Sequence, residues 1–135
     1  AGLVIHEGRL TYTDLGFQKI VDIGEWWKQQ TGLPLPLGGN VIRRALGPEN
    51  IALASEVMRK GIQHALDNRE ESIDWLLSRG GALRDAGRVS EYLNMYANAE
   101  TIGYSDRARA GLVELYNRAH AAGLIGKPVP VDFAP

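Results

Sequence analysis

Apolar side chains recur at helical spacing through much of the chain, beginning with a helix expected from Pro48 to about Asn68. Proline suits the first turn because the N–H it lacks would have no intrahelical partner there, and the neighbouring Glu49 complements the helix dipole. One apolar residue follows at every third or fourth position and marks one face of this helix. These residues are Ile51, Ala54, Met58, Ile62 and Ala65.

A second helix is expected directly after the first. Asn68 and Glu71 have the spacing of a capping box, in which each side chain satisfies a free backbone N–H at the start of a helix. Gly80-Gly81 ends the pattern. The apolar positions between these signals predict a buried face of Ile73, Leu76 and Leu77.

The apolar pattern predicts two further helices. The third runs from about Asp85 to about Asn98. The fourth begins at Ser105 or Asp106 and ends at Gly123, a residue type that commonly closes helices. Their apolar faces are expected to bury Val89, Leu93 and Tyr96 in the third helix, and Ala108, Leu112, Leu115 and Ala119 in the fourth.

The first residues follow a different pattern. Leu3-Val4-Ile5 is a short apolar run typical of a buried strand, and it ends at His6-Glu7 with Gly8 as a breaker. A strand needs neighbours, and the chain offers few candidates to pair with this one. A strand from residues 31–40 is one alternative. We favour partners outside this chain and therefore expect the chain to be a fragment of a longer protein.

Residues 22–40 contain a short helix and then an extended segment. Trp26-Trp27 lies in one or two expected helical turns closed by Gly32, with one ring in the core and one at an interface or cleft rim. In residues 33–37 leucines alternate with prolines, which excludes a helix and favours an edge strand, a crossover or a cleft wall. Gly38-Gly39 then permits close approach to the backbone, by a substrate or a moving lobe.

Charge and composition narrow the function classes. Fifteen basic and sixteen acidic residues leave a formal charge of −1, and no basic stripe indicates nucleic-acid binding. No apolar run has the length of a membrane span, so no membrane partner is expected. The chain has no cysteine, which excludes disulfides, thiol catalysis and cysteine-ligated zinc and agrees with a cytoplasmic setting.

His6 is the best candidate for chemistry. Imidazole can accept a proton near neutral pH, as a general base must, and His6 follows an apolar strand, where α/β proteins often place catalytic groups. The alternative is an exposed histidine bonded to the backbone. Glu7 could orient His6, but neighbours on a strand face opposite ways, so a surface acid is the simpler interpretation.

Other polar residues give weaker signals. Arg43-Arg44 could bind a substrate carboxylate, although a solvated pair or a salt bridge to another element is the more common role. His64 and His120 fall on different expected helices without further ligands at metal-binding spacing, so no metal site is predicted. Capping or surface roles are expected for Asn94, Asn98 and Thr101.

Several of these stretches together resemble the 1,4-dihydroxy-6-naphthoate synthases, enzymes of the futalosine route to menaquinone. The most specific is the L-P-L-P-L-G-G-N block of residues 33–40. Looser similarity continues through residues 94–101 and 118–124. The other matching stretches are Gly2-Leu3-Val4-Ile5-His6-Glu7-Gly8 and Asp22-Ile23-Gly24-Glu25-Trp26-Trp27.

The resemblance implies an α/β fold of the type II periplasmic-binding-protein kind, with two lobes around a ligand cleft. This chain would be a mostly helical C-terminal portion with few strands. Residues 1–20 would end the second lobe and form the crossover, and residues 21–135 would be the C-terminal helical part of the first lobe. The partner of the chain would then be the missing N-terminal half of the enzyme.

The resemblance also implies a reaction and a site. Family members convert a small molecule, cyclic dehypoxanthine futalosine, to 1,4-dihydroxy-6-naphthoate without a metal or organic cofactor. His6 matches the family's catalytic base, and Gly38, Gly39 and Asn40 are the expected substrate contacts. This chain alone is expected to be inactive, and its open strand could form a homodimer by exchange. A non-catalytic solute-binding module on the same fold is the alternative, and a purely structural helical fragment is a third.

Overall fold

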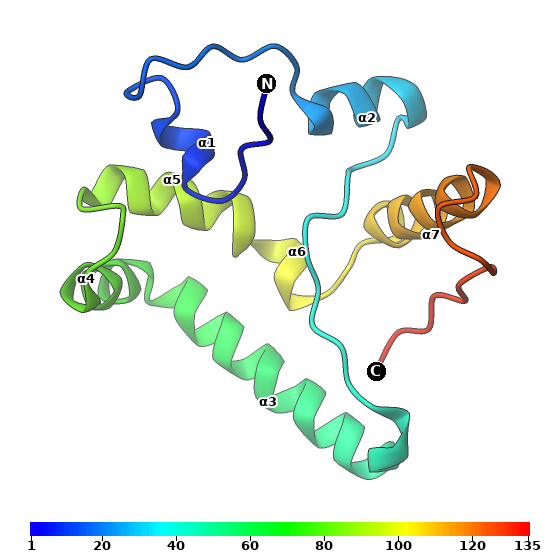
Figure 1. Cartoon of the computed structure of the whole chain (residues 1–135). Coiled ribbons are helices and arrows are strands. Elements are labelled where there is room, and N and C mark those ends of the chain that lie inside the picture. Colours follow the sequence, from blue (N-terminus) through cyan, green and yellow to red (C-terminus); the bar gives the residue numbers. More distant parts are fainter. The chain divides into compact units, whose positions relative to one another are not determined.

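The computed structural model describes residues 1–135 and contains seven α-helices, one 3₁₀-helix and no β-strand (Figure 1). The elements are α1 (Gly8–Thr11), α2 (Ile23–Thr31), the 3₁₀-helix η1 (Arg44–Leu46), α3 (Pro48–Asp67), α4 (Arg69–Arg79), α5 (Ala86–Tyr96), α6 (Ala99–Ile102) and α7 (Asp106–Ala121).

The chain forms two compact units, and each is built from two separate stretches. The first unit comprises Ala1–Ile20 and Gly61–Ile102, and the second comprises Val21–Lys60 and Gly103–Pro135. Helix α3 contributes its beginning to the second unit and its end to the first. No helix is both long enough and apolar enough to cross a membrane.

The helices expected from the apolar pattern are confirmed as α3, α4, α5 and α7, and the short helix before Gly32 is confirmed as α2. Local end signals explain their bounds. The side chains of Asp85 and Ser105 accept hydrogen bonds from the backbone N–H groups of Arg88 and Ala108, at 3.0 and 3.2 Å. Gly32 closes α2 in the left-handed conformation, which glycine adopts without steric cost.

The predicted second helix begins where expected but is not capped as expected. The Asn68 side chain makes no capping bond to α4. Its amide instead donates to the carbonyl of His64 at 2.8 Å and lies 3.2 Å from the His64 ring nitrogen. The capping-box prediction is therefore wrong. Helix α3 ends one residue before Asn68, and the side-chain amide of Asn68 binds the end of that helix instead of the start of α4.

The first residues also differ from the prediction. Leu3-Val4-Ile5 has no regular secondary structure, and Gly8 starts the short helix α1 instead of a loop. The few strands expected do not form, because ladder hydrogen bonds need a neighbouring strand and this chain contains none. Pairing of residues 3–5 with strands outside this chain stays a prediction.

Few apolar side chains are fully buried. The buried ones are Trp27, Ile51 and Val89, whereas Met58 and Leu76 of the expected buried faces are exposed. Several large apolar side chains are strongly exposed, among them Leu3 at 74%, Ile20 at 86% and Val41 at 98%. The helical period was correct, but within each unit too few elements pack together to cover every apolar face.

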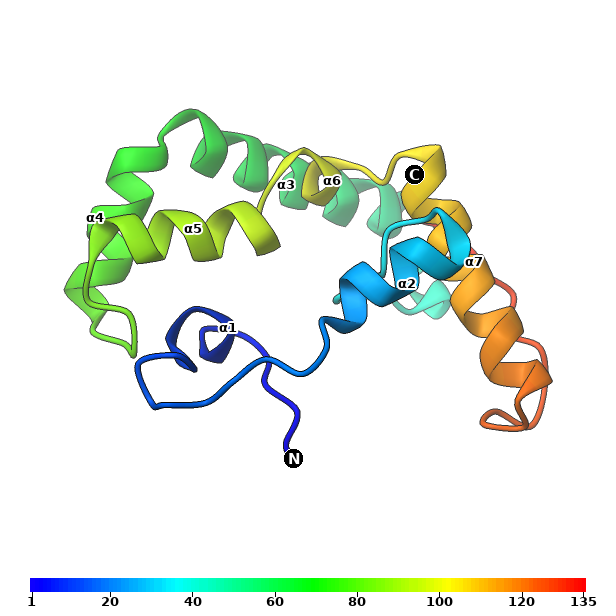
Figure 2. The same cartoon turned by 90° about the horizontal axis from the view of Figure 1, so that it is seen from above.

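In the first unit, α4 contacts α5, and Figure 2 shows the two helices crossing rather than running side by side. Arg69, at the start of α4, ties them together at the end of α5. Its guanidinium donates to the side-chain oxygen of Asn94 at 2.7 Å and to the carbonyl of Ala97 at 3.2 Å. Charge-assisted bonds of this kind are stronger than neutral ones, so the end of α5 is held in place.

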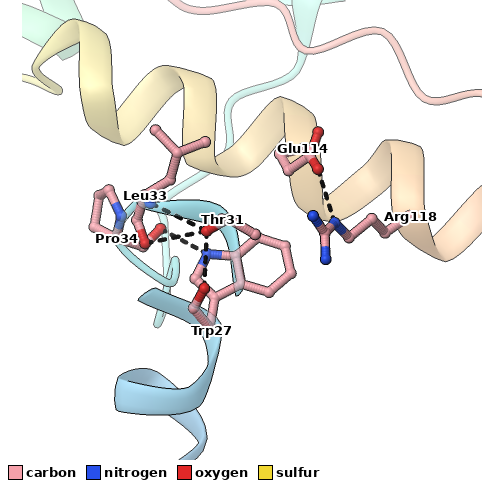
Figure 3. Close-up of polar contacts among 6 residues, drawn as sticks. All are labelled: Trp27, Thr31, Leu33, Pro34, Glu114 and Arg118. Carbon is pink, nitrogen blue, oxygen red and sulfur yellow. Dashed lines mark hydrogen bonds and ion pairs between the residues drawn. The ribbon is translucent and has the colours of Figure 1, made fainter. Parts of the chain in front are cut away.

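In the second unit, the buried Trp27 of α2 contacts both α7 and the extended stretch of residues 33–37, which we call the proline-rich segment (Figure 3). Its indole N–H donates to the carbonyl of Pro34 at 3.2 Å, and the Arg118 guanidinium of α7 lies 5.4 Å from its ring. Trp26 is 48% exposed, whereas Trp27 is buried. The prediction that one of the two rings lies in the core and the other outside it is therefore confirmed.

The proline-rich segment also lies against the middle of α7. A Cβ atom placed on Gly111 would lie 2.5 Å from the Pro34 carbonyl oxygen and 3.8 Å from the Cβ of Leu33. Glycine at this position therefore lets the extended backbone approach the helix more closely than any side chain would allow.

Candidate functional site

His6 has an unusual backbone conformation. Its φ of 52° lies in the left-handed region, and it is the only residue other than glycine that has a positive φ. The turn around it is fixed by hydrogen bonds from the N–H of Gly8 to Ile5 and from the N–H of Arg9 to His6, both 3.1 Å long. Left-handed non-glycine residues are uncommon and concentrate at functional sites, so this geometry supports a role for His6.

The His6 side chain is exposed and stacks on an aromatic ring of α5. Its imidazole centroid lies 5.9 Å from that of Tyr96, with 27° between the ring planes. Tyr96 in turn lies 4.7 Å from the Tyr92 ring, one helical turn earlier. Three rings thus form an aromatic cluster that combines the candidate base with two phenols, all within the first unit.

Glu7 belongs to the same cluster. Burial raises the pKa of the Tyr92 hydroxyl, and the neighbouring Tyr96 and the Glu7 carboxylate raise it further. Glu7 is half-buried rather than fully exposed. The turn at residues 5–8 replaces the expected strand and brings Glu7 toward the same helix as His6.

A salt bridge attaches the loop after α1 to the same helix. Arg88 of α5 contacts the Asp14 carboxylate at 2.6 Å, and both side chains are about half exposed. Exposed ion pairs contribute little stability. This one nevertheless gives the N-terminal stretch a second point of contact with α5, besides the stacking of His6 on Tyr96.

Gly38, Gly39 and Asn40, the expected substrate contacts, lie in the second unit and are exposed. In the structure, the hydroxyl of Tyr104 of the same unit donates to the carbonyl of Gly38 at 3.2 Å, and approach by a substrate or a moving lobe stays a prediction. A Cβ on Gly39 would lie 3.0 Å from that hydroxyl, whereas a Cβ on Gly38 would meet nothing. His6 and these three residues therefore belong to different units.

We expect Gly39→Ala to destabilise the second unit, because the added methyl group displaces the Tyr104 hydroxyl from the Gly38 carbonyl. A lost hydrogen bond of this kind costs about 0.5–1.5 kcal/mol in the free energy of unfolding. Urea unfolding should show this loss for Gly39→Ala and almost none for Gly38→Ala. Adding Tyr104→Phe to Gly39→Ala should cause little further loss. Fully additive losses would contradict the contact.

Arg44 binds the C-terminal tail of the chain. Its guanidinium forms an ion pair with Asp132 at 2.7 Å and donates to the carbonyl of Phe133 at 3.0 Å. The Phe133 ring lies under the Arg109 guanidinium at 4.2 Å and edge-on to Tyr104. For Arg44 the salt-bridge alternative is confirmed, and the sequence pattern contained no signal for its partner in the tail.

The remaining polar candidates have local partners. His120 lies in the last turn of α7, and its ring nitrogen is 3.2 Å from the carbonyl of Ile125. Asn98 accepts from the N–H of Glu100 at the start of α6, and its own N–H donates to Thr101 at 3.0 Å, which confirms the expected capping roles. No three His, Asp or Glu side chains cluster in a way that could hold a metal ion.

Comparison with known proteins places this chain in a biosynthetic enzyme family. Residues 1–121 match the family model described as menaquinone biosynthesis, and the chain belongs to this family. The chain is 36% identical over 124 residues to the 1,4-dihydroxy-6-naphtoate synthase of Thermus thermophilus, and 34% identical over 125 residues to that of Streptomyces coelicolor. The resemblance inferred from the sequence motifs is confirmed.

These relatives are longer than this chain. The matches cover 92% and 93% of the chain but 45% and 44% of the two relatives, so the chain spans about half their length. A crystal structure of protein AF1704 from Archaeoglobus fulgidus is 40% identical and superposes with a TM-score of 0.82. It matches 90% of this chain and 46% of its own length.

Proposed function

We propose that this chain is the C-terminal part of a 1,4-dihydroxy-6-naphthoate synthase, a lyase that forms this product from cyclic dehypoxanthine futalosine. The observation that carries the proposal is the similarity to two synthases over nearly the whole chain. It favours an enzyme over a non-catalytic solute-binding module of the same fold.

The first unit offers a suitable group for the chemistry. Forming an aromatic diol from the cyclic substrate requires a proton to be removed as the bonds rearrange toward aromaticity. The His6 imidazole is exposed, so a substrate can reach it, and it extends from a left-handed turn. Imidazole accepts protons near neutral pH without extensive tuning, so His6 acts as the general base without a cofactor. Gly38, Gly39 and Asn40 would contact the substrate.

The rest of the enzyme would complete the fold. We propose a two-lobe fold of the type II periplasmic-binding-protein kind, in which the N-terminal half covers apolar residues that are exposed here. Eight of the exposed large apolar side chains lie in residues 3–23. Large exposed apolar side chains of this kind are candidates for burial against a partner. These residues are Leu3, Val4, Ile5, Leu15, Phe17, Ile20, Val21 and Ile23.

The test compares this chain with the complete enzyme that contains it. The complete enzyme should form 1,4-dihydroxy-6-naphthoate from cyclic dehypoxanthine futalosine, as followed by chromatography of the product. The chain alone should form none, because about half of the relatives' length is absent from it. No product from the complete enzyme would refute the proposed function. Product from the chain alone would refute its dependence on the other half.

A further inference from the structure

The aromatic cluster around His6 contains a second residue whose arrangement bears on the reaction. Tyr96 is the ring on which the imidazole of His6 stacks, at 5.9 Å between centroids and 27° between planes. Aromatic pairs in this range of separation attract one another and restrict each other's orientation. The imidazole therefore has Tyr96 as a stacking neighbour, while the His6 side chain as a whole remains exposed.

The Tyr96 ring is itself held in place. It contacts Tyr92 at 4.7 Å on one side and lies at the last residue of α5. Arg69 fixes this end of the helix through the carbonyl of Ala97 and the side chain of Asn94. A ring supported in this way has less freedom to rotate than a ring on an open surface.

His6 needs such support because its own backbone does not provide it. The residue sits in a short turn between an irregular segment and the four-residue helix α1, and no hydrogen bond to its ring is present. An exposed imidazole on a turn would otherwise sample several rotamers, and proton transfer requires a defined direction toward the substrate.

From this geometry we propose that Tyr96 is a positioning residue, whose aromatic ring orients the imidazole of His6 for proton transfer. The proposal rests on the proposed function of His6 as the base. The aromatic ring of Tyr96, and not its hydroxyl, orients the imidazole, because the two residues contact each other by stacking of their rings. Tyr96 itself does not exchange a proton with the substrate.

The test compares Tyr96→Leu, which removes the ring, with Tyr96→Phe, which keeps it. In the complete enzyme, Tyr96→Leu should lower kcat about 10-fold to 10²-fold with little change in KM, as expected for a misoriented catalytic group. Tyr96→Phe should retain most of the rate. Trp75→Leu is the matched control, because it removes an exposed aromatic ring from α4 of the same unit.

A spectroscopic measurement separates stacking from a general structural effect. The ring protons of His6 should shift in the NMR spectrum of Tyr96→Leu, because the ring current of Tyr96 is lost, and should stay near their original position in Tyr96→Phe. Trp75→Leu should leave them in place. This measurement needs no substrate, so it tests the stacking even if the parent enzyme forms no naphthoate and the proposed function fails.

Two results would overturn the proposal. If the His6 resonances are the same in Tyr96→Leu and in the parent protein, Tyr96 does not hold the imidazole. If Tyr96→Phe loses as much kcat as Tyr96→Leu, the hydroxyl matters and the stack does not. Loss of folded protein is recognised from circular dichroism, and Tyr96→Met then tests the same contact with a side chain of more similar length.

Discussion

Replacing His6 with asparagine in the complete enzyme is expected to lower kcat by about 10²–10⁴-fold, the usual contribution of a positioned general base. Substrate affinity should change much less, because the imidazole acts mainly in the transition state. Single-turnover formation of 1,4-dihydroxy-6-naphthoate measures this effect directly, since product release does not enter.

Asparagine is the appropriate substitution for a structural reason. His6 has a φ of 52°, and asparagine adopts the left-handed conformation more readily than most other residues. His6→Asn therefore removes the base while keeping the turn, whereas His6→Ala would add backbone strain. Unchanged circular dichroism would confirm that the fold is retained.

The control for this experiment is Glu7→Gln, because the Glu7 carboxylate belongs to the same aromatic cluster and is the obvious competitor. We expect it to lose less activity than His6→Asn. If His6→Asn stays within a few-fold of the parent while Glu7→Gln loses its activity, the base is the carboxylate and the assignment to His6 is wrong.

Gly111→Ala is expected to reduce the free energy of unfolding by about 1–3 kcal/mol, as overpacking of a filled site typically does. Helix propensity alone predicts the opposite, since alanine favours a helix interior over glycine by about 1 kcal/mol. The packing term wins because the new methyl group would lie 2.5 Å from the backbone oxygen of Pro34. That oxygen also accepts the Trp27 indole N–H, so it cannot move without breaking this bond.

Gly61→Ala is the matched control. Gly61 lies inside α3, and a Cβ atom there would meet nothing within 4 Å. This substitution should stabilise the protein by about 0.5–1 kcal/mol through helix propensity alone. Urea unfolding followed by tryptophan fluorescence measures both variants. A stabilising Gly111→Ala would show that the proline-rich segment does not pack closely on α7.

Local signals made most of the helices predictable. Proline at the start of α3, the capping side chains of Asp85 and Ser105 and the closing Gly32 each act within a few residues, so the sequence reveals them. Asn68 marks the limit of such signals. Its side chain had two competing local partners, and the spacing of residues alone could not decide between them.

The candidate site was predicted in part. The motif around His6 and the resemblance it supports were apparent in the sequence. The left-handed turn was not, because the apolar run of residues 3–5 has the pattern of a strand and its pairing could not be judged from sequence. The spacing of apolar residues predicted that Tyr96 lies on the buried face of its helix. Its contact with His6 forms only when residues 1–20 and 61–102 pack together in the first unit.

The sequence by itself therefore determined where the helices lie, the family to which the chain belongs and the identity of the candidate base, because these depend on local pattern and on motifs. Only the tertiary structure decided that Tyr96 supports His6, that Tyr104 lies at Gly39 and that Pro34 packs on Gly111. Each of these contacts joins residues far apart in the chain, and no local spacing encodes which distant surface a side chain will meet.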